Sequence, residues 1–447
     1  MIKIYDTMTR SLRDFVPLTE NIVNMYVCGP TVYNYIHIGN ARSTVAFDTI
    51  RRYFEYRGYT VNYISNFTDV DDKIIKAANE AGISTKELSD KFITAFMEDT
   101  AQLGIKPATQ NPRVINYMDE IIAFVSTLID KGFAYVAEGD VYFRVAKSNN
   151  YAKLANKTLE DLEIGASGRT DAETARKENP LDFALWKAAK EGEISWDSPW
   201  GPGRPGWHIE CSVMATEILG DTIDIHGGGA DLEFPHHTNE IAQSEAKTGK
   251  TFANYWMHNG FVNVDNEKMS KSLGNFVTVH DMLKTVDGQV LRFFLATQQY
   301  RKPINFTEKA IHDAEVNLKY LKNTHSLPLT EEVSQAELQT YLDAFQAAMD
   351  DDFNTANGVT VLFDMAKWIN SGNYDQSVKD AFEKILQVFG IVFEEEVLDE
   401  DIEKLIEERQ AARANKDFAT ADRIRDELAA QGIKLLDTKE GVRWTRD

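Results

Sequence analysis

The sequence predicts an α/β protein whose parallel sheet is split by an insertion and followed by a helical region and a small α+β unit. Two observations predict the sheet. A strand over residues 22–28, a helix from about Gly39 to just before Gly58 and a strand over residues 59–67 follow one another. Strand patterns return at residues 223–226 and 255–262. Strand, helix and strand in this order favour parallel pairing with a right-handed crossover, a Rossmann-like arrangement.

At 447 residues the chain is too long for one ordinary core. Residues 1–113 and 201–303 are predicted to form two halves of the sheet domain. Residues 114–200, with helix, short strands and a charged stretch over 170–179, form an insertion between them. Residues 304–393 are helical, with helices over 313–322, 335–349, 355–369 and 378–388. An acidic stretch over 394–401 then opens a terminal unit, 394–447, with helices over 402–415 and 419–431 and a β-hairpin over 433–444.

Composition limits the class of protein. Hydrophobic residues make up 43% and charged residues 26% of the chain, as in globular proteins. We expect a cytoplasmic protein without a membrane partner, because the sequence has no apolar run of membrane-spanning length and no signal peptide at its start. The net charge of −22 is unevenly spread: residues 331–400 hold 16 acidic and 3 basic residues, but residues 401–447 hold 11 and 10. The terminal unit therefore permits RNA binding without predicting it.

The two cysteines, Cys28 and Cys211, are far apart in the sequence. A structural disulfide is not expected in a reducing compartment. Two buried thiols that act as small apolar side chains are the ordinary alternative to a functional role.

A first candidate phosphate site is the segment His37-Ile38-Gly39-Asn40, at the amino end of the first predicted helix. Unpaired N–H groups and the helix dipole favour an anion there. Gly39 allows a nucleotide to approach the backbone, and His37 and Asn40 can both donate hydrogen bonds to a phosphate. An ordinary helix cap is the commoner explanation of such a segment.

A second candidate is the loop Lys268-Met269-Ser270-Lys271-Ser272, which carries two ammonium groups among small residues. Transfer of a phosphoryl or nucleotidyl group needs positive charge at the phosphate in the transition state, and a mobile loop can deliver it. A solvated charged loop is the alternative. Together on one predicted sheet, the two elements indicate an enzyme that uses ATP.

The pair resembles the HIGH and KMSKS motifs of class I aminoacyl-tRNA synthetases, with Asn40 where the last His of the first motif usually stands. Along its whole length the chain resembles the bacterial cysteinyl-tRNA synthetases. Further matching segments are residues 26–33, 68–75, 206–212, 226–237 and 349–355. The resemblance implies a monomeric ligase that converts L-cysteine and Mg-ATP to cysteinyl-adenylate and pyrophosphate. The cysteinyl group then passes to the 3′ end of tRNA(Cys).

In that family a zinc ion lies in the amino-acid pocket. The positions that match its ligands are Cys28, Cys211, His236 and Glu240. Pro235 suits the first turn of a helix, on which His236 and Glu240 would share one face. Two thiolates, an imidazole and a carboxylate make a tetrahedral zinc set. His237 is the competing ligand. Adjacent histidines on a helix cannot easily both reach one metal, so we expect only one of His236 and His237 to bind it. A substrate thiolate bound to zinc would separate cysteine from serine.

The resemblance also assigns the other site residues. Thr68 and Trp207 match positions that line the cysteine pocket, although Trp207 could equally pack in the core. Gly228, Gly229 and Asp231 match the segment that holds adenosine, with Asp231 a candidate for the ribose hydroxyls. A glycine-rich turn after a strand explains the glycines equally well. The implied ATP-binding set is His37, Gly39, Asn40, Gly228, Gly229, Asp231 and Lys271. The implied catalytic set is His37, Asn40, Lys268 and Lys271, which would stabilise charge without a covalent nucleophile.

The helical region and the terminal unit match the anticodon-binding part of the family. Side chains that could meet phosphates are Arg409, Arg413, Lys416, Arg423, Arg425, Arg443 and Arg446. Trp444 could stack on an unpaired base. Solvent-facing charges on amphipathic helices explain each cation as well.

Three other functions stay open. A ligase that joins cysteine to a small amine would resemble the catalytic half but lack the terminal unit. A zinc-dependent RNA-binding module without catalysis would have lost the lysine loop or the His37 element. A secondary formation of persulfides with pyridoxal phosphate would use lysines such as Lys73, Lys76 and Lys268.

Overall fold

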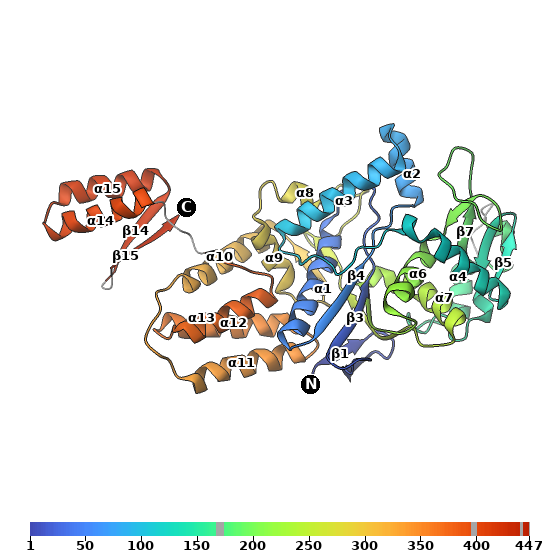
Figure 1. Cartoon of the computed structure of the whole chain (residues 1–447), viewed down its shortest axis with the longest axis horizontal. Helices are drawn as coiled ribbons and strands as arrows, with labels where there is room; N and C mark the ends of the chain where they lie inside the picture. The colour runs from blue at the N-terminus through green and yellow to red at the C-terminus, as the bar shows by residue number, and fades with distance from the viewer. Residues whose placement is uncertain (167–173, 395–399, 439–440, 447) are drawn as a thin grey trace. The chain divides into compact units, whose positions relative to one another are not determined.

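The computed structural model describes residues 1–166, 174–394, 400–438 and 441–446 (Figure 1). The chain forms two compact units, Met1–Val392 and Phe393–Asp447. Most of the predicted acidic stretch over 394–401, and residues 170–173 of the predicted charged stretch, lie outside the described residues.

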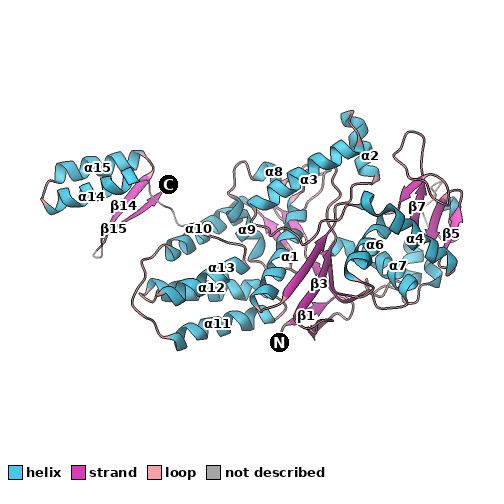
Figure 2. Cartoon of the chain, in the orientation of Figure 1, coloured by secondary structure: helices cyan, strands magenta, loops and turns pink. Residues whose placement is uncertain are grey.

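The first unit is built on a parallel four-stranded sheet in the order β10-β9-β3-β4 (Figure 2). The strands are β3 (Ile22–Val27), β4 (Thr60–Ser65), β9 (Ile223–Gly229) and β10 (Ala253–Asn259). Helix α1 (Ile38–Tyr56) connects β3 to β4, which confirms the predicted strand–helix–strand unit. Since β3 pairs with β9, the chain returns to the same sheet after the insertion, as predicted.

Helix α1 packs closely on this sheet. Val45, Ile50 and Phe54 recur at helical spacing and are buried. Gly227 of β9 permits the close approach, because a Cβ atom there would overlap the ring of Phe47 on α1. The position of α1, and with it the His37 element at its amino end, therefore follows from its packing on the strands.

The segment between the two halves of the sheet forms an antiparallel sheet of its own, in the order β5-β6-β7-β8. Its strands are β5 (Ala134–Ala137), β6 (Asp140–Phe143), β7 (Phe183–Ala188) and β8 (Gly203–Pro205). The helices before and around it are α2 (Asp72–Ala81), α3 (Thr85–Gln102), α4 (Met118–Asp130), α5 (Leu159–Ala166), α6 (Trp207–Leu219) and α7 (Thr238–Thr248). Shorter turns of helix are Val114–Tyr117, Val145–Lys147, Thr174–Arg176, Ala230–Leu232 and Glu233–His237. One apolar cluster, which includes Leu128, Trp186 and Trp256, joins this region to the parallel sheet.

The single strand predicted over residues 255–262 is wrong. The chain leaves the parallel sheet after Asn259, and β11 (Val262–Val264) belongs to another sheet, with β12 (Glu267–Lys268) and β13 (Ile304–Phe306). The break lies at Gly260, whose N–H donates to the Tyr300 carbonyl at 2.8 Å. A Cβ atom at Gly260 would lie 2.5 Å from the Lys302 carbonyl carbon, so only glycine allows this approach.

The predicted helices are present; three of the four in the helical region agree within two residues at each end, but the one predicted over 313–322 begins five residues earlier and ends three residues later. After α8 (Val279–Met282) and α9 (Gly288–Ala296) come α10 (Glu308–His325), α11 (Gln335–Asp350), α12 (Thr355–Asn370) and α13 (Gln376–Val388). A hairpin of β1 (Lys3–Asp6) and β2 (Ser11–Asp14) opens the chain. Among the described ranges, no helix combines the length and apolar character needed to cross a membrane.

The second unit contains α14 (Glu400–Ala414), α15 (Phe418–Ala430) and an antiparallel hairpin of β14 (Ile433–Thr438) and β15 (Gly441–Arg446). Ile402, Ile424, Leu428 and Ile433 form its core. Arg409 is only 4% exposed and donates two hydrogen bonds, of 2.9 and 3.0 Å, to Asp437. Its burial contradicts the solvent-facing alternative, and its guanidinium is engaged inside the unit.

Arg409→Gln is expected to weaken the second unit by about 1 kcal/mol, somewhat less than the usual contribution of a charge-assisted bond, because solvent screens the exposed Asp437. Hydrogen exchange of the amides in α14, α15 and β14 measures this loss. Arg409 lowers the pKa of Asp437, so its stabilisation is present above the unfolded value near 3.9 and disappears as the pH falls below it. Arg425→Gln, at an exposed side chain, is the matched control; an equal effect from both variants contradicts the assignment.

Candidate functional site

The His37 element and the lysine loop, far apart in the sequence, lie beside each other. The Ile38 N–H donates to the Val277 carbonyl at 3.0 Å, and the Val279 N–H donates to the Ile36 carbonyl at 2.9 Å. A Cβ atom on Gly39 would lie 3.6 Å from the Met269 methyl carbon. The His37 element and the lysine loop, both predicted as phosphate sites, therefore lie next to each other and border the same region.

His37 and Asn40 cap α1 reciprocally. The Asn40 N–H donates to His37 Nδ1 at 3.2 Å, and the His37 N–H donates to Asn40 Oδ1 at 3.2 Å. Because Nδ1 accepts, the ring proton of neutral His37 lies on Nε2. Burial lowers the pKa of His37, so the ring is a neutral donor near pH 7. The Asn40 side-chain oxygen accepts the capping bond, and its NH₂ group is left as a donor. The helix cap and the predicted phosphate contact are therefore compatible.

The lysine loop is folded by Asn275. Its Oδ1 accepts from the Ser270 N–H at 2.8 Å, and its Nδ2 donates to the Lys268 carbonyl at 3.3 Å. Lys268 and Lys271 are exposed. The Lys271 ammonium lies 5.3 Å from the centre of the Tyr33 ring and 5.4 Å from that of Phe276. It also lowers the pKa of His37, so its charge is felt at the first element.

The segment that matches adenosine binding ends a strand, so the alternative of a glycine-rich turn after the strand is wrong. Gly228 and Gly229 are the last residues of β9, and Asp231 follows in a short helical turn. A Cβ atom on Gly228 would lie 2.9 Å from the His237 ring, so glycine is needed for packing. The pKa of His37 is lowered mainly by burial, and the charge of Asp231 opposes this shift.

A second group of side chains gathers around Cys28, which directly follows β3. Cys28, Cys211, His236 and Glu240 each offer a ligand atom, and these atoms all lie within 4.8 Å of one another. The two sulfurs are 3.4 Å apart, Cys28 Sγ is 3.3 Å from Glu240 Oε1, and His236 Nε2 is 3.0 Å from the same oxygen. Ligand atoms of a tetrahedral zinc site are separated by roughly 3.3–3.8 Å. All four predicted ligands thus meet in a group that could hold a metal ion.

Protons on the thiols and on the imidazole would compete with a cation for this group. Burial raises the pKa of Cys28. Burial also opposes ionisation of Cys211, but hydrogen bonds from Cys28 and His236 outweigh it and lower the pKa to about 6. For His236, burial lowers the pKa, but the charges of Glu240 and Cys211 and the hydrogen bonds to them together outweigh burial and raise the pKa to about 10. A bound divalent cation would displace these protons, as metals do from thiols and imidazoles.

The competing histidine, His237, lies in a second group that shares two members with the first. This group consists of Cys28, His226, His237 and Glu240. His237 Nε2 is 3.4 Å from Cys28 Sγ, while its Nδ1 is 2.8 Å from His258 Nε2. His258 in turn meets the Thr7 hydroxyl at 2.7 Å. Neither group contains both His236 and His237, in agreement with the expectation for adjacent histidines.

The start of α7 differs from the prediction. The helix begins at Thr238 instead of near Pro235, because Phe234 has extended backbone angles (φ −143°, ψ 132°) and the segment Glu233–His237 winds irregularly. His236 and Glu240 nevertheless meet, since the irregular turn leads directly into the helix.

The two predicted cysteine-pocket residues border the metal group. Thr68 is buried; its hydroxyl donates to Glu210 Oε2 at 3.0 Å and accepts from Asn66 Nδ2 at 3.2 Å. Asn66 Oδ1 is 3.6 Å from Cys211 Sγ. Trp207 is 40% exposed and stacks on the His236 ring at 4.2 Å between centroids, so the alternative of core packing is wrong.

Comparisons with known proteins agree along the whole chain. The family described as "tRNA synthetases class I (C) catalytic domain" matches residues 14–316, "DALR domain" matches 344–394, and "Cysteinyl-tRNA ligase anticodon binding domain" matches 395–444. A protein from Streptococcus thermophilus described as "Cysteine--tRNA ligase" is 97% identical over 447 residues, which is 100% of both chains. One from Streptococcus pyogenes with the same description is 83% identical over the same length. The chain belongs to the cysteinyl-tRNA synthetase family.

Among solved structures, Mycobacterium tuberculosis methionyl-tRNA synthetase in complex with methionyl-adenylate has the same fold. The TM-score is 0.60 at 15% identity, over 82% of this chain and 89% of that one. An Agrobacterium radiobacter LeuRS in a ternary complex gives a TM-score of 0.59 at 10% identity, over 84% of each chain. The class I synthetase fold predicted for this cysteinyl-tRNA synthetase family member is confirmed.

The residues that hold the site residues in place were not predicted from the sequence. His226 donates its bond to the second Glu240 oxygen at 2.6 Å, and Glu210 and Asn66 hold Thr68. His226 and Glu210 lie inside segments that match the family, but a match gives no contact. In the sequence, the strand periodicity was the one indication of a role for His226, because it places His226 and Gly228 on the same face of β9.

In this family member, Asn40→Ala is expected to weaken the first turn of α1 by about 1 kcal/mol, since it removes the acceptor of the His37 N–H. Hydrogen exchange of amides at residues 37–41 would then be about fivefold faster. Thr44→Ala, one turn later, is the control because it removes only a side-chain bond to the Asn40 carbonyl. Unchanged exchange in Asn40→Ala contradicts the capping role.

Proposed function

We propose that this chain is a cysteine–tRNA ligase that activates L-cysteine with Mg-ATP and transfers it to the 3′ end of tRNA(Cys). The observation that carries the proposal is the meeting of two groups at one end of the sheet. One group, around Gly39 and the lysine loop, suits a triphosphate. The other, around Glu240, offers two sulfur donors beside Thr68 and Trp207 and suits a thiol substrate.

The alternatives fit less well. A ligase for a small amine would lack the last part of the chain, whereas residues 395–444 match an anticodon-binding domain. An RNA-binding module without catalysis would not need the His37 element beside an intact lysine loop, and both are present in contact. The relatives that share the full length of the chain are described as cysteine–tRNA ligases.

Zinc is the metal that we propose for the first group, held by Cys28, Cys211, His236 and Glu240. That group supplies two sulfur donors and the second group only one, and zinc favours thiolates over harder ligands. The ion would supply a strong preference for a thiolate over a neutral hydroxyl, which separates cysteine from serine without an editing step. His226 would hold the outer Glu240 oxygen and so fix the direction of the inner one.

The chain's own residues would handle the phosphates by charge and position. The cysteine carboxylate attacks the α-phosphorus of ATP as the bond to pyrophosphate breaks. His37 Nε2–H and the Asn40 NH₂ group donate to phosphate oxygens, and Lys268 and Lys271 approach with their loop as negative charge develops. Asp231 is proposed for the ribose hydroxyls, and Thr68 and Trp207 for the wall of the cysteine pocket.

The five-part division at residues 113, 200, 303 and 393 is retained as a proposal for the domains. That the protein is a monomer and that it acts in the cytoplasm are predictions from the sequence.

Cysteine-dependent exchange of labelled pyrophosphate into ATP tests the function. We expect exchange with L-cysteine and at least about a hundredfold less with L-serine. Lys271→Ala is expected to lower the exchange rate by a factor of about 10² to 10³, the size found for removal of one transition-state contact. Lys319→Ala, an exposed lysine on α10, is the control. Equal exchange with serine refutes the role of the sulfur group, and no exchange with any amino acid refutes the ligase.

A further inference from the structure

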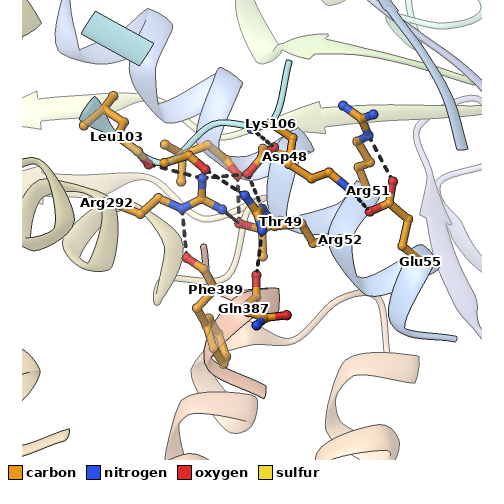
Figure 3. Close-up of polar contacts among 12 residues, drawn as sticks. Asp48, Thr49, Arg51, Arg52, Glu55, Leu103, Lys106, Arg292, Gln387 and Phe389 are labelled. Carbon is orange, nitrogen blue, oxygen red and sulfur yellow. Dashed lines mark hydrogen bonds and ion pairs between the residues drawn. The ribbon is translucent and has the colours of Figure 1, made fainter. Parts of the chain in front are cut away.

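A fully buried arginine joins three separate parts of the first unit (Figure 3). Arg292 of α9 lies 2.6 Å from Asp48 of α1, with side chains 0% and 3% exposed. The same guanidinium donates from Nε to the Phe389 carbonyl at 2.8 Å and from Nη2 to the Thr49 hydroxyl at 3.1 Å. Phe389 directly follows α13, so this one side chain connects α1, α9 and the end of the helical region.

Arg52 makes a parallel connection. Its Nε donates to Asp48 Oδ2 at 2.8 Å and its Nη1 to the Gln387 carbonyl at 3.1 Å. The other Asp48 oxygen accepts from the Lys106 N–H at 3.0 Å. Burial alone would raise the pKa of Asp48, but the two arginines outweigh it and keep the carboxylate ionised. Every polar group of this buried cluster that faces the carboxylate thus has a partner.

The backbone at the end of α13 is shaped around the guanidinium. Gly390 has φ +75°, and a Cβ atom there would overlap the Arg292 guanidinium. Gly104 has φ +66°, and its Cβ atom would lie 2.9 Å from the Gly390 carbonyl oxygen. Two glycines in left-handed conformations are therefore needed for the helical region to approach α9 and Arg292 this closely.

The contact between α1 and α9 does not depend on Arg292 alone. Arg42 of α1, also buried, donates to the Leu295 carbonyl at 2.6 Å and the Gln299 carbonyl at 2.9 Å at the far end of α9. The apolar face of α1 packs on the sheet independently. What Arg292 adds to these contacts is the bond to the Phe389 carbonyl, one of several ties between α1 and the helical region, beside Arg52 to Gln387 and Arg57 to Asp350.

We propose that Arg292 is a positioning residue that holds α11–α13 in register with the active site, so that charging of tRNA depends on it while activation of cysteine does not. The inference rests on the proposed function. Activation uses only groups at the end of the sheet. A tRNA that contacts the helical region must also bring its 3′ end to the active site, so a shift between these parts misplaces the acceptor end.

Arg292→Lys separates the two steps. The lysine keeps a buried cation opposite Asp48, but a single ammonium cannot reproduce the fork that bridges Asp48, Thr49 and the Phe389 carbonyl. We expect cysteine-dependent pyrophosphate exchange within about twofold of wild type. The kcat/KM for charging tRNA should fall by about tenfold, the effect of losing one charge-assisted hydrogen bond.

Arg42→Lys is the matched control, because Arg42 is equally buried but bonds only carbonyls that precede the helical region. It should lower exchange and charging by the same factor. Thermal unfolding by circular dichroism verifies that each variant is folded at the assay temperature. If Arg292→Lys does not fold, Arg52→Lys decides, since Arg52 is 17% exposed and makes the parallel bond to Gln387.

Wild-type exchange with cysteine tests the proposed function separately. Suppose that the wild type exchanges pyrophosphate and charges tRNA normally. If Arg292→Lys, or Arg52→Lys in its place, then lowers both activities equally or lowers neither, the positioning role is refuted and the ligase function stands. If wild type shows no cysteine-dependent exchange, the function fails first. A selective loss of charging supports the inference.

Discussion

The buried carboxylate of Glu240 is the constraint around which the candidate site is arranged. His226 bonds one oxygen at 2.6 Å and His236 the other at 3.0 Å. Burial would raise its pKa, but the two imidazoles outweigh burial and hold the pKa well below the ordinary value. A buried anion is tolerated only when it is paired in this way. Strand β9, helix α7 and the turn between them therefore converge on one point.

From that point the site divides into two parts. The sulfurs of Cys28 and Cys211 lie against Glu240, at the ends of β3 and within α6. The His37 element begins α1, which follows β3 in the chain, and the lysine loop is held against it by backbone hydrogen bonds. Both parts lie where the parallel strands end, the usual position of ligand sites in such sheets. One part suits a thiol and the other a triphosphate, so the reacting groups of an adenylate-forming reaction would meet between them.

Local patterns predicted the elements of the fold well. The strands β3 and β4 could be predicted from their apolar runs. Helix α1 could be predicted from the helical spacing of Val45, Ile50 and Phe54. The four metal-group residues were found because they match a family, since spacing alone cannot show that Cys28 and Cys211 meet. The break at Gly260 was missed because its cause is the backbone of Lys302, more than 40 residues away in the sequence.

The late start of α7 has a local cause that was not predicted from the sequence. Phe234 has extended backbone angles, as the steric restriction on a residue before proline favours, so the helix begins only after Pro235. The sequence alone indicates a surface cation at Arg409. In the structure this side chain is buried in the second unit, where it pairs with Asp437 on a later strand. Arg292 likewise shows its function only through partners on α1 and after α13. For Arg409 and Arg292, a contact distant in sequence determines the role of the side chain.

X-ray absorption at the zinc edge, measured on the zinc-loaded protein with and without L-cysteine, counts the sulfur neighbours of the metal. We expect two sulfur neighbours at about 2.3 Å in the free protein, from Cys28 and Cys211, and three when L-cysteine is bound. L-Serine should leave the sulfur count at two. A single sulfur in the free protein would favour the group with His226 and His237, and an unchanged count on addition of L-cysteine would contradict direct recognition of the substrate sulfur.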